Sequence, residues 1–314
     1  MVNFVNTIDL LGDEATTKAI IERTITEFHD DMLKSVGANA FQSCTALTSV
    51  DLPNVTSTGG NNGSAFNGCT QLVNINMPKL EKMGNNEFSG CSKLTSISFP
   101  SVTSVGGSSF SSCTALKSVD LPKITSLNSS MVFSGCSSLA IINIPMLTNP
   151  GDYTFQNCTA LASVDFPLVT RVGSYVFNKC TALANVNIPL AASIGSSSFL
   201  DCTSLKHIDL PSATSLGASC FSGCSILDVI ILRKEAVCTM SNFNAVRNTP
   251  FYDVQGPGGK ALVPRSQVAG YETATNWSSV WAQNPNNRIL ALEDYTVDGT
   301  ITGEIDWDKL GGTT

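Results

Sequence analysis

Eleven cysteines are the residues of this 314-residue chain most able to do chemistry, and nine of them recur at steps of mostly 22 residues. A zinc site needs close pairs such as C-x-x-C, and the sequence contains none. A disulfide ladder needs a bond geometry that positions stacked in parallel rarely meet. We therefore interpret the nine as small, reduced, buried core residues: Cys44, Cys69, Cys91, Cys113, Cys136, Cys158, Cys180, Cys202 and Cys224. Cys220 and Cys238 lie outside the column and could be exposed.

Other candidates for catalysis are few. The two histidines are His29, near the start, and His207, which alternates with Asp209 so that both should lie on one exposed strand face. We interpret His207 and Asp209 as a solvated pair rather than as part of a catalytic triad. The stretch from Gln255 to Lys260 has glycines and a lysine without the spacing of a phosphate loop, which favours a surface turn. We predict no enzyme, no metal and no cofactor.

The composition of the chain argues against two further classes of protein, those that bind nucleic acid and those that insert into a membrane. The net charge is −7, whereas phosphate binding needs clustered Lys and Arg, so nucleic acid is not an expected partner. No stretch approaches the roughly 20 apolar residues of a membrane helix, so insertion into a membrane is not expected either. The start of the sequence has no visible signal peptide. We therefore expect export, if it occurs, by another route or within a larger particle.

The cysteines belong to a repeat that predicts the fold. Its unit reads F-x-x-C-[ST]-x-L-x-x-[IV]-x-Φ-P, where Φ is apolar, and it occurs nine times. Eight units end in proline, and Arg233 takes that place in the last. The alternation after the leucine predicts a half-buried strand, and proline suits the point where the strand ends. A single unit cannot bury its apolar residues, but stacked units form a continuous core.

The rest of each unit predicts connections. Gly106, Gly173, Gly195 and Gly217 suit a tight turn into the next phenylalanine. The two longer steps place their extra residues between Pro53 and Phe66 and between Pro122 and Phe133. Both insertions fall in the half of the unit away from the strand, as expected for loops on one face.

The repeat resembles the BspA-like leucine-rich repeats over about 200 residues, roughly Lys34 to Leu232. The resemblance is carried by Val36-Gly-Ala-Asn-Ala-Phe-Gln-Ser-Cys-Thr-Ala-Leu-Thr-Ser-Val-Asp-Leu-Pro53. It implies an α/β repeat fold, a leucine-rich-repeat solenoid of about nine coils of 22–23 residues with a parallel β-sheet on one face. A helical N-terminal cap and an irregular C-terminal cap should close its ends.

The predicted organisation has four parts. Residues 1–33 form the N-terminal cap with a helix over 13–26, residues 34–232 the solenoid, and residues 233–294 the C-terminal cap. Residues 295–314 are a tail or docking segment, and their sequence looks like tails of repeat proteins encoded in gut bacterial prophages. Tyr271, Trp277 and Trp281 offer a contact patch, although a role in the core of the cap is favoured.

The candidate binding site is the exposed strand face, where two columns of small polar and acidic side chains should run. Such a face could accept hydrogen bonds from a glycan, a peptide or a basic partner. Small polar residues also suit a crowded sheet face without any ligand, and the columns lack the aromatic rings on which sugars stack. The candidate residues are Asn74, Asn76, Ser96, Ser98, Asp120, Asn143, Asp165, Asn187, His207 and Asp209.

Members of the resembled family are typically bacterial surface or secreted proteins associated with adhesion and protein binding. The resemblance therefore implies a non-enzymatic binding or adhesion module that presents its surface to a protein or a cell-surface glycan. Its expected location is extracellular, on the cell surface or on a virion, as in a phage tail. The alternative is an intracellular, cytoplasmic scaffold for protein interactions.

Overall fold

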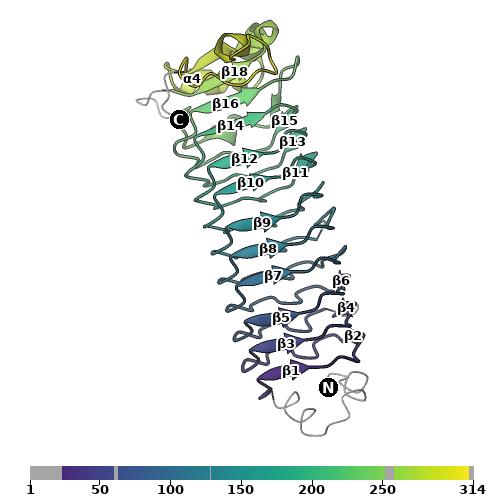
Figure 1. Ribbon diagram of the computed structural model, residues 1–314. Helices are drawn as coiled ribbons and strands as arrows, with labels where there is room; N and C mark the ends of the chain where they lie inside the picture. Colours follow the sequence, from purple (N-terminus) through teal and green to yellow (C-terminus); the bar gives the residue numbers. More distant parts are fainter. Residues whose placement is uncertain (1–22, 60–62, 128, 252–257, 311–314) are drawn as a thin grey trace. The chain divides into compact units, whose positions relative to one another are not determined.

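The computed structural model describes residues 23–59, 63–127, 129–251 and 258–310. The chain divides into two compact units, which we call the N-terminal unit (1–161) and the C-terminal unit (162–314). Each unit is a stack of coils in which a turn of about 22 residues adds a short strand to a parallel face sheet, and many turns add a second, shorter strand (Figure 1). The predicted solenoid is confirmed, with about ten coils in all.

The N-terminal unit contains two kinds of strand. Three-residue strands form the main strand face and pair in parallel in the orders β1-β3-β5 and β7-β8-β9. They are β1 (Glu27–His29), β3 (Ser49–Asp51), β5 (Asn74–Asn76), β7 (Ser96–Ser98), β8 (Ser118–Asp120) and β9 (Ile141–Asn143). Two-residue strands on another side of the coil are β2 (Ser35–Val36), β4 (Ser57–Thr58) and β6 (Lys82–Met83).

The C-terminal unit repeats this plan and then departs from it. Its face strands are β10 (Ser163–Asp165), β12 (Asn185–Asn187), β14 (His207–Leu210), β16 (Val229–Leu232), β18 (Lys260–Val263) and β19 (Arg288–Ala291). Its short strands are β11 (Arg171–Val172), β13 (Ser193–Ile194), β15 (Ser215–Leu216) and β17 (Thr239–Met240). Its helices are η1 (Phe243–Val246), η2 (Arg265–Gln267), α3 (Val268–Thr273), α4 (Trp277–Gln283) and η3 (Leu292–Tyr295). Within the described ranges no helix is long and apolar enough to cross a bilayer.

In both units, strands occur beyond the predicted limits of the solenoid. The helix predicted over 13–26 falls largely outside the described residues, and the described part, from residue 23, is not helical. Instead β1 pairs with β3, because Phe28 points inward and its ring lies 4.8 Å from that of Phe41. At the other end β18 and β19 extend the β14-β16 sheet in parallel, so residues 233–294 are more regular than the sequence predicts.

Phenylalanine, leucine and cysteine fill the core of each coil. In the N-terminal unit the rings of Phe41 and Phe66 stack at 5.1 Å, and in the C-terminal unit those of Phe177 and Phe199 stack at 5.2 Å. All eleven cysteines are free and buried. Most thiols of the column donate to the phenylalanine carbonyl of the preceding coil, as Cys69 does to Phe41 at 3.0 Å. These hydrogen bonds satisfy buried backbone acceptors, which supports the structural interpretation of the column.

The two cysteines outside the column are also buried, so the prediction that they could be exposed is wrong. Cys220 lies in the core beside the column, where burial raises the pKa of its thiol well above the ordinary value. Cys238 is enclosed by the C-terminal cap: its amide donates to the Tyr271 hydroxyl at 2.7 Å, and its carbonyl accepts from the Trp277 indole at 2.7 Å. Neither thiol is therefore available as a surface nucleophile.

The repeated glycines are required for a different reason from the one that the sequence suggests. A Cβ atom on Gly195 would lie 2.4 Å from the carbonyl oxygen of Gly173, and one on Gly217 would lie 2.6 Å from Gly195. Neither glycine has a positive φ. They are needed because the backbones of successive coils touch there, not because of a left-handed turn.

Candidate functional site

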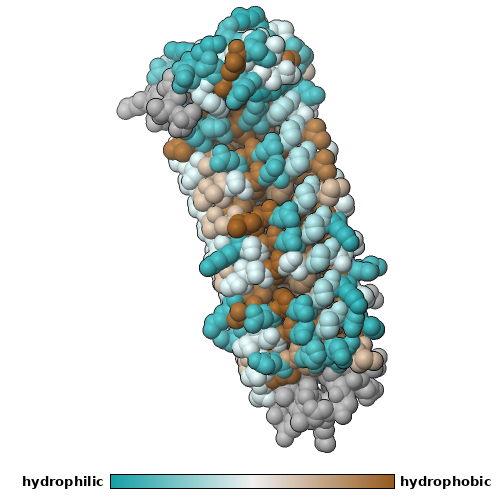
Figure 2. Space-filling view, viewed as in Figure 1, coloured by the Kyte–Doolittle hydropathy of each residue, from teal (hydrophilic) through white to brown (hydrophobic). Residues whose placement is uncertain are grey.

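The strand face carries the predicted polar columns in register. Within each sheet, neighbouring face strands pair at equivalent positions, as Asp120 does with Asn143 and Asp165 with Asn187. Figure 2 shows mostly hydrophilic or intermediate side chains on the visible face, with hydrophobic ones scattered among them. The register places equivalent residues of paired strands side by side within each sheet.

Much of this face satisfies its own hydrogen bonds. In the N-terminal unit the Asn143 amide donates to Asp120 at 2.6 Å, and the Ser98 hydroxyl donates to the same carboxylate at 2.7 Å. In the C-terminal unit Asn187 donates to Asp165 at 2.7 Å. Carboxylates and amides from neighbouring coils therefore stabilise one another, which is sufficient reason for their presence in the N-terminal unit.

In the C-terminal unit a second element covers part of the face. We call residues 296–310 the C-terminal segment. It begins as a hairpin in which Thr296 and Ile305 form an antiparallel bridge and Val297 donates to the Glu304 carbonyl at 2.9 Å. The predicted tail is thus a folded part of the C-terminal unit up to residue 310.

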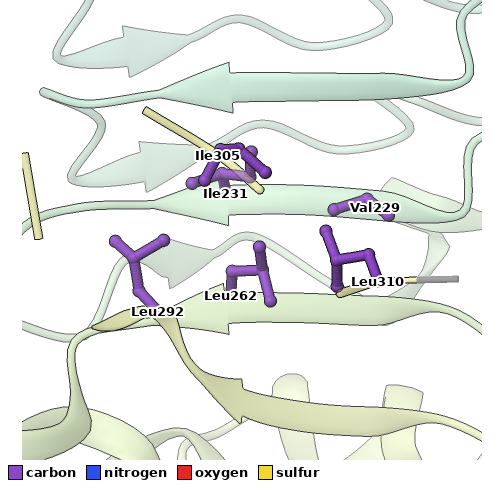
Figure 3. Packing of buried hydrophobic residues seen from close by; sticks show 6 residues of the cluster. All are labelled: Val229, Ile231, Leu262, Leu292, Ile305 and Leu310. Carbon is purple, nitrogen blue, oxygen red and sulfur yellow. The ribbon is translucent and has the colours of Figure 1, made fainter. Parts of the chain in front are cut away.

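Apolar contacts fix this segment to the sheet. Ile305 and Leu310 pack on side chains from β16, β18 and η3 (Figure 3). The cluster consists of Val229, Ile231, Leu262, Leu292, Ile305 and Leu310. Val229 and Ile231 occupy positions that are mostly polar in the other coils. Their apolar side chains are explained by this cover, because a polar group buried there would lose its hydrogen bonds to water.

Arg233 is the polar anchor of the segment. Its guanidinium contacts the Asp209 carboxylate at 2.6 and 3.0 Å and donates to the carbonyls of Ile301 and Gly303 at 2.7 and 2.9 Å. The fork of donors suits this task, since one side chain satisfies a carboxylate and two backbone acceptors. Arg233 stands where the other eight units have proline, so the departure from the repeat marks the docking point. Lys260 adds a hydrogen bond of 2.9 Å to the Leu310 carbonyl.

The segment brings an aromatic ring to the face. Trp307 is partly buried, and the centroid of its ring lies 4.2 Å from that of His207 on β14. Burial lowers the pKa of His207, so its imidazole is neutral at neutral pH and packs against the indole without a charge to desolvate. The ring that the columns lack is therefore supplied from 100 residues further along the chain.

A groove of about 510 Å³ lies between the C-terminal segment and strands β10, β12 and β14. Its volume falls in the range of roughly 300–1,000 Å³ that is typical of small-ligand sites. Its polar and aromatic lining includes Ser163, Asp165, Asn185, Asn187, His207, Asp209, Arg233, Glu304 and Trp307. We take this groove as the candidate binding site.

The groove divides the predicted site residues into two groups. It brings together Asp165, Asn187, His207 and Asp209. The other six lie on the strand face of the N-terminal unit and do not line it: Asn74, Asn76, Ser96, Ser98, Asp120 and Asn143. Sequence reasoning missed Arg233 and Trp307 as site residues. The signal that could have found them was the loss of the repeat at positions 229, 231 and 233.

The aromatic candidates of the C-terminal cap make structural contacts. Tyr271 and Trp277 are fully buried against Cys238, as expected for residues of the cap core, and Trp281 stacks on Trp277 at 5.4 Å. Residues 252–257 lie outside the described residues, so the turn predicted over 255–260 is described only at its end, where Lys260 belongs to β18. Across the described ranges, no group of three His, Cys, Asp or Glu side chains could hold a metal ion.

Comparison with protein families identifies the repeat. The profile described as "BspA type Leucine rich repeat region" matches residues 21–140 and 129–249 in six copies, well over half of the chain. A comparison with curated proteins finds no match.

Solved structures share the repeat at low identity. A leucine rich cell surface protein from Faecalibacterium prausnitzii is 22% identical over 82% of this chain and 87% of that one, with a TM-score of 0.49. A leucine-rich repeat protein of T. pallidum is 27% identical over 62% and 72% of the two chains, with a TM-score of 0.36. One from Bacteroides ovatus is 21% identical over 85% and 92%, with a TM-score of 0.31.

Proposed function

The chain belongs to the BspA-type leucine-rich repeat family, and from this premise we propose that it is a non-catalytic binding module that acts at a bacterial surface. The observation that carries the proposal is the groove between the C-terminal segment and the strand face. Asp165 and Asn187 supply its polar floor, and Trp307 supplies an aromatic side. A repeat scaffold with a concavity on its strand face is the arrangement expected of a recognition protein.

A binding role is favoured over catalysis by the state of the reactive groups. Burial raises the pKa of several column thiols, for example that of Cys69 to about 12, which makes these thiols poor nucleophiles. In the groove, Asp209 is held by Arg233 and His207 by Trp307. These residues are committed to positioning the C-terminal segment.

We infer a location at the bacterial surface because the repeats belong to the BspA type, and the resemblance to that family implies a surface or secreted protein. Buried thiols that resist oxidation suit an extracellular compartment as well as the cytoplasm, so the cysteine content does not favour the intracellular scaffold. Attachment to a virion or phage tail stays a prediction from the sequence of residues 295–314.

The test measures adhesion of the purified, fluorescently labelled full chain to intact bacterial cells and to mucin-coated plates. We expect saturable binding to at least one of them, and a loss of at least about tenfold in affinity for Asp165→Lys because the new cation occupies the groove floor. Asp120→Lys is the matched control. Both aspartates accept an amide hydrogen bond from the next coil, but only Asp165 lines the groove.

Two outcomes would contradict the proposal. The first is the absence of saturable binding to both surfaces. The second is equal loss of binding for both variants, which would place recognition on the whole strand face or on charge alone, not in the groove.

A further inference from the structure

The groove combines an aromatic surface with a polar one. On one side is the indole of Trp307, a flat apolar ring that stays partly exposed beside His207. On the other side is a floor of short polar side chains on β10 and β12, namely Ser163, Asp165, Asn185 and Asn187, all exposed. An aromatic ring beside polar groups suits a ligand with one apolar face and several hydroxyl groups.

The floor can both donate and accept hydrogen bonds. Each asparagine amide has two donors and a carbonyl acceptor, and the Asp165 carboxylate has two acceptor oxygens. The Asn187 amide nitrogen donates one hydrogen bond to Asp165, and the amide oxygen of Asn187 can still accept one from a ligand. Hydroxyl groups need such mixed partners, because each hydroxyl donates one hydrogen bond and accepts others.

The charges of the groove exclude anionic ligands. Its lining contains the carboxylates of Asp165, Asp209 and Glu304 and the guanidinium of Arg233. The guanidinium is already used by Asp209 and by the carbonyls of Ile301 and Gly303. A phosphate, sulfate or sialic acid would therefore meet negative charge without a free cation to pair with.

From these observations we infer that the groove binds a neutral glycan. A pyranose ring would pack its C–H face on Trp307 and direct its hydroxyls to Asp165, Asn185 and Asn187. The inference rests on the proposed binding function and names the ligand class for the same groove. It also explains why the C-terminal segment matters beyond capping: without Trp307 the strand face has polar groups and no stacking surface.

The experiment titrates the full chain with neutral oligosaccharides, namely chitotriose, maltotriose and lacto-N-tetraose, and follows the indole N–H signals by NMR. The chain has three tryptophans, and Trp277 and Trp281 lie in the cap, so they serve as internal references. We expect at least one glycan to shift the Trp307 signal saturably with a Kd of about 1 mM or below. Sialyllactose should bind at least about tenfold more weakly than its neutral counterpart lactose.

Tryptophan variants distinguish a loss of ring stacking on the glycan from a loss of the folded structure. Trp307→Ala should lose glycan binding, and Trp307→Phe should retain part of it because a ring remains. Trp281→Phe, outside the groove, should bind as the parent does. Melting curves identify any loss of fold, and a Trp307→Phe variant that is folded but equal to Trp307→Ala in binding would remove the stacking argument.

The failures of the two proposals are distinguishable. If no neutral glycan shifts Trp307 up to roughly 10 mM, while Asp165→Lys still abolishes adhesion to cells, the ligand class is wrong and the groove function stands. If a Lys-rich peptide shifts Trp307 and the glycans do not, the partner is a basic protein segment. If adhesion is also absent, both proposals are overturned.

Discussion

The strand faces of the two units begin from the same repeat and end in opposite environments. In the N-terminal unit Asp120 and Asn143 are exposed or half-buried and pair with each other. In the C-terminal unit the column reaches Asp209 and then Ile231, which is 1% exposed beneath the C-terminal segment. The comparison teaches that the regular repeat builds the scaffold, whereas the positions that break it hold the C-terminal segment that completes the candidate groove.

The largest expected effect on stability comes from restoring the polar residue of the repeat at position 231. Ile231→Asn introduces the residue that the same column has at 143 and 187, and we expect it to destabilise the C-terminal unit by about 4 kcal/mol. The reason is the loss of a buried aliphatic side chain together with the burial of an amide without partners. Denaturant unfolding followed by tryptophan fluorescence measures it, since all three tryptophans lie in this unit.

The N-terminal unit provides the matched control. Ile141 also replaces a polar residue of the strand face, but it is 65% exposed and has no covering segment. Ile141→Asn should change stability by no more than about 0.5 kcal/mol. Equal costs for the two variants would show that the C-terminal segment does not bury Ile231 in solution.

The interior of the N-terminal unit should carry its own pH dependence. Glu87 is fully buried in the column that precedes each phenylalanine, and burial raises its pKa from 4.5 to about 7. Because the folded pKa lies above the unfolded one, the stability contribution is complete below pH 4.5 and is lost as the pH rises through 7. A shift of this size corresponds to about 3 kcal/mol.

We therefore expect the N-terminal unit to be less stable at pH 8 than at pH 5.5, and Glu87→Gln to remove most of this difference. Urea unfolding followed by far-UV circular dichroism at the two pH values measures it. Glu81→Gln, at an exposed position of the same coil, is the control and should keep the parent's pH dependence. A parent whose stability is flat across this range would show that the Glu87 carboxylate is hydrated.

The polar anchor of the C-terminal segment should have an intermediate effect. Arg233→Ala leaves the Asp209 carboxylate and two carbonyls without their donor, and we expect a cost of about 2 kcal/mol. Hydrogen exchange should increase across 296–305. Arg265→Ala is the control: its ion pair with Asp294 is exposed, so its cost should stay below about 1 kcal/mol. Unchanged exchange in Arg233→Ala would mean that the apolar cluster alone holds the segment.

The sequence predicts the scaffold well because the scaffold is periodic. The phenylalanine, cysteine and leucine columns are buried in every coil, so Phe41, Cys44 and Leu47 suffice to place their equivalents. The site is harder to predict because it depends on a contact between distant parts of the chain. Val229, Ile231 and Arg233 show that something covers the face, but no period in residues 296–310 identifies them as the cover.

The smallest expected effects on stability come from two asparagines at equivalent positions on the strand faces of the two units. Asn143→Ala and Asn187→Ala each remove one exposed amide donor from an aspartate of the preceding coil, at 2.6 and 2.7 Å. Both should cost about 0.5 kcal/mol or less, because water replaces the amide at an exposed carboxylate. Melting temperatures of the two variants should therefore be nearly equal.

Ligand binding should distinguish the Asn143→Ala variant from the Asn187→Ala variant. Asn187 lies on the groove floor, so its loss should weaken binding to the neutral glycan by several-fold, whereas Asn143→Ala should bind as the parent does. If both variants bind normally, the amides of the two faces have the same structural role and the groove recognises its ligand through Trp307 alone. A difference in binding without a difference in stability would show that one repeat position serves the scaffold in one unit and recognition in the other.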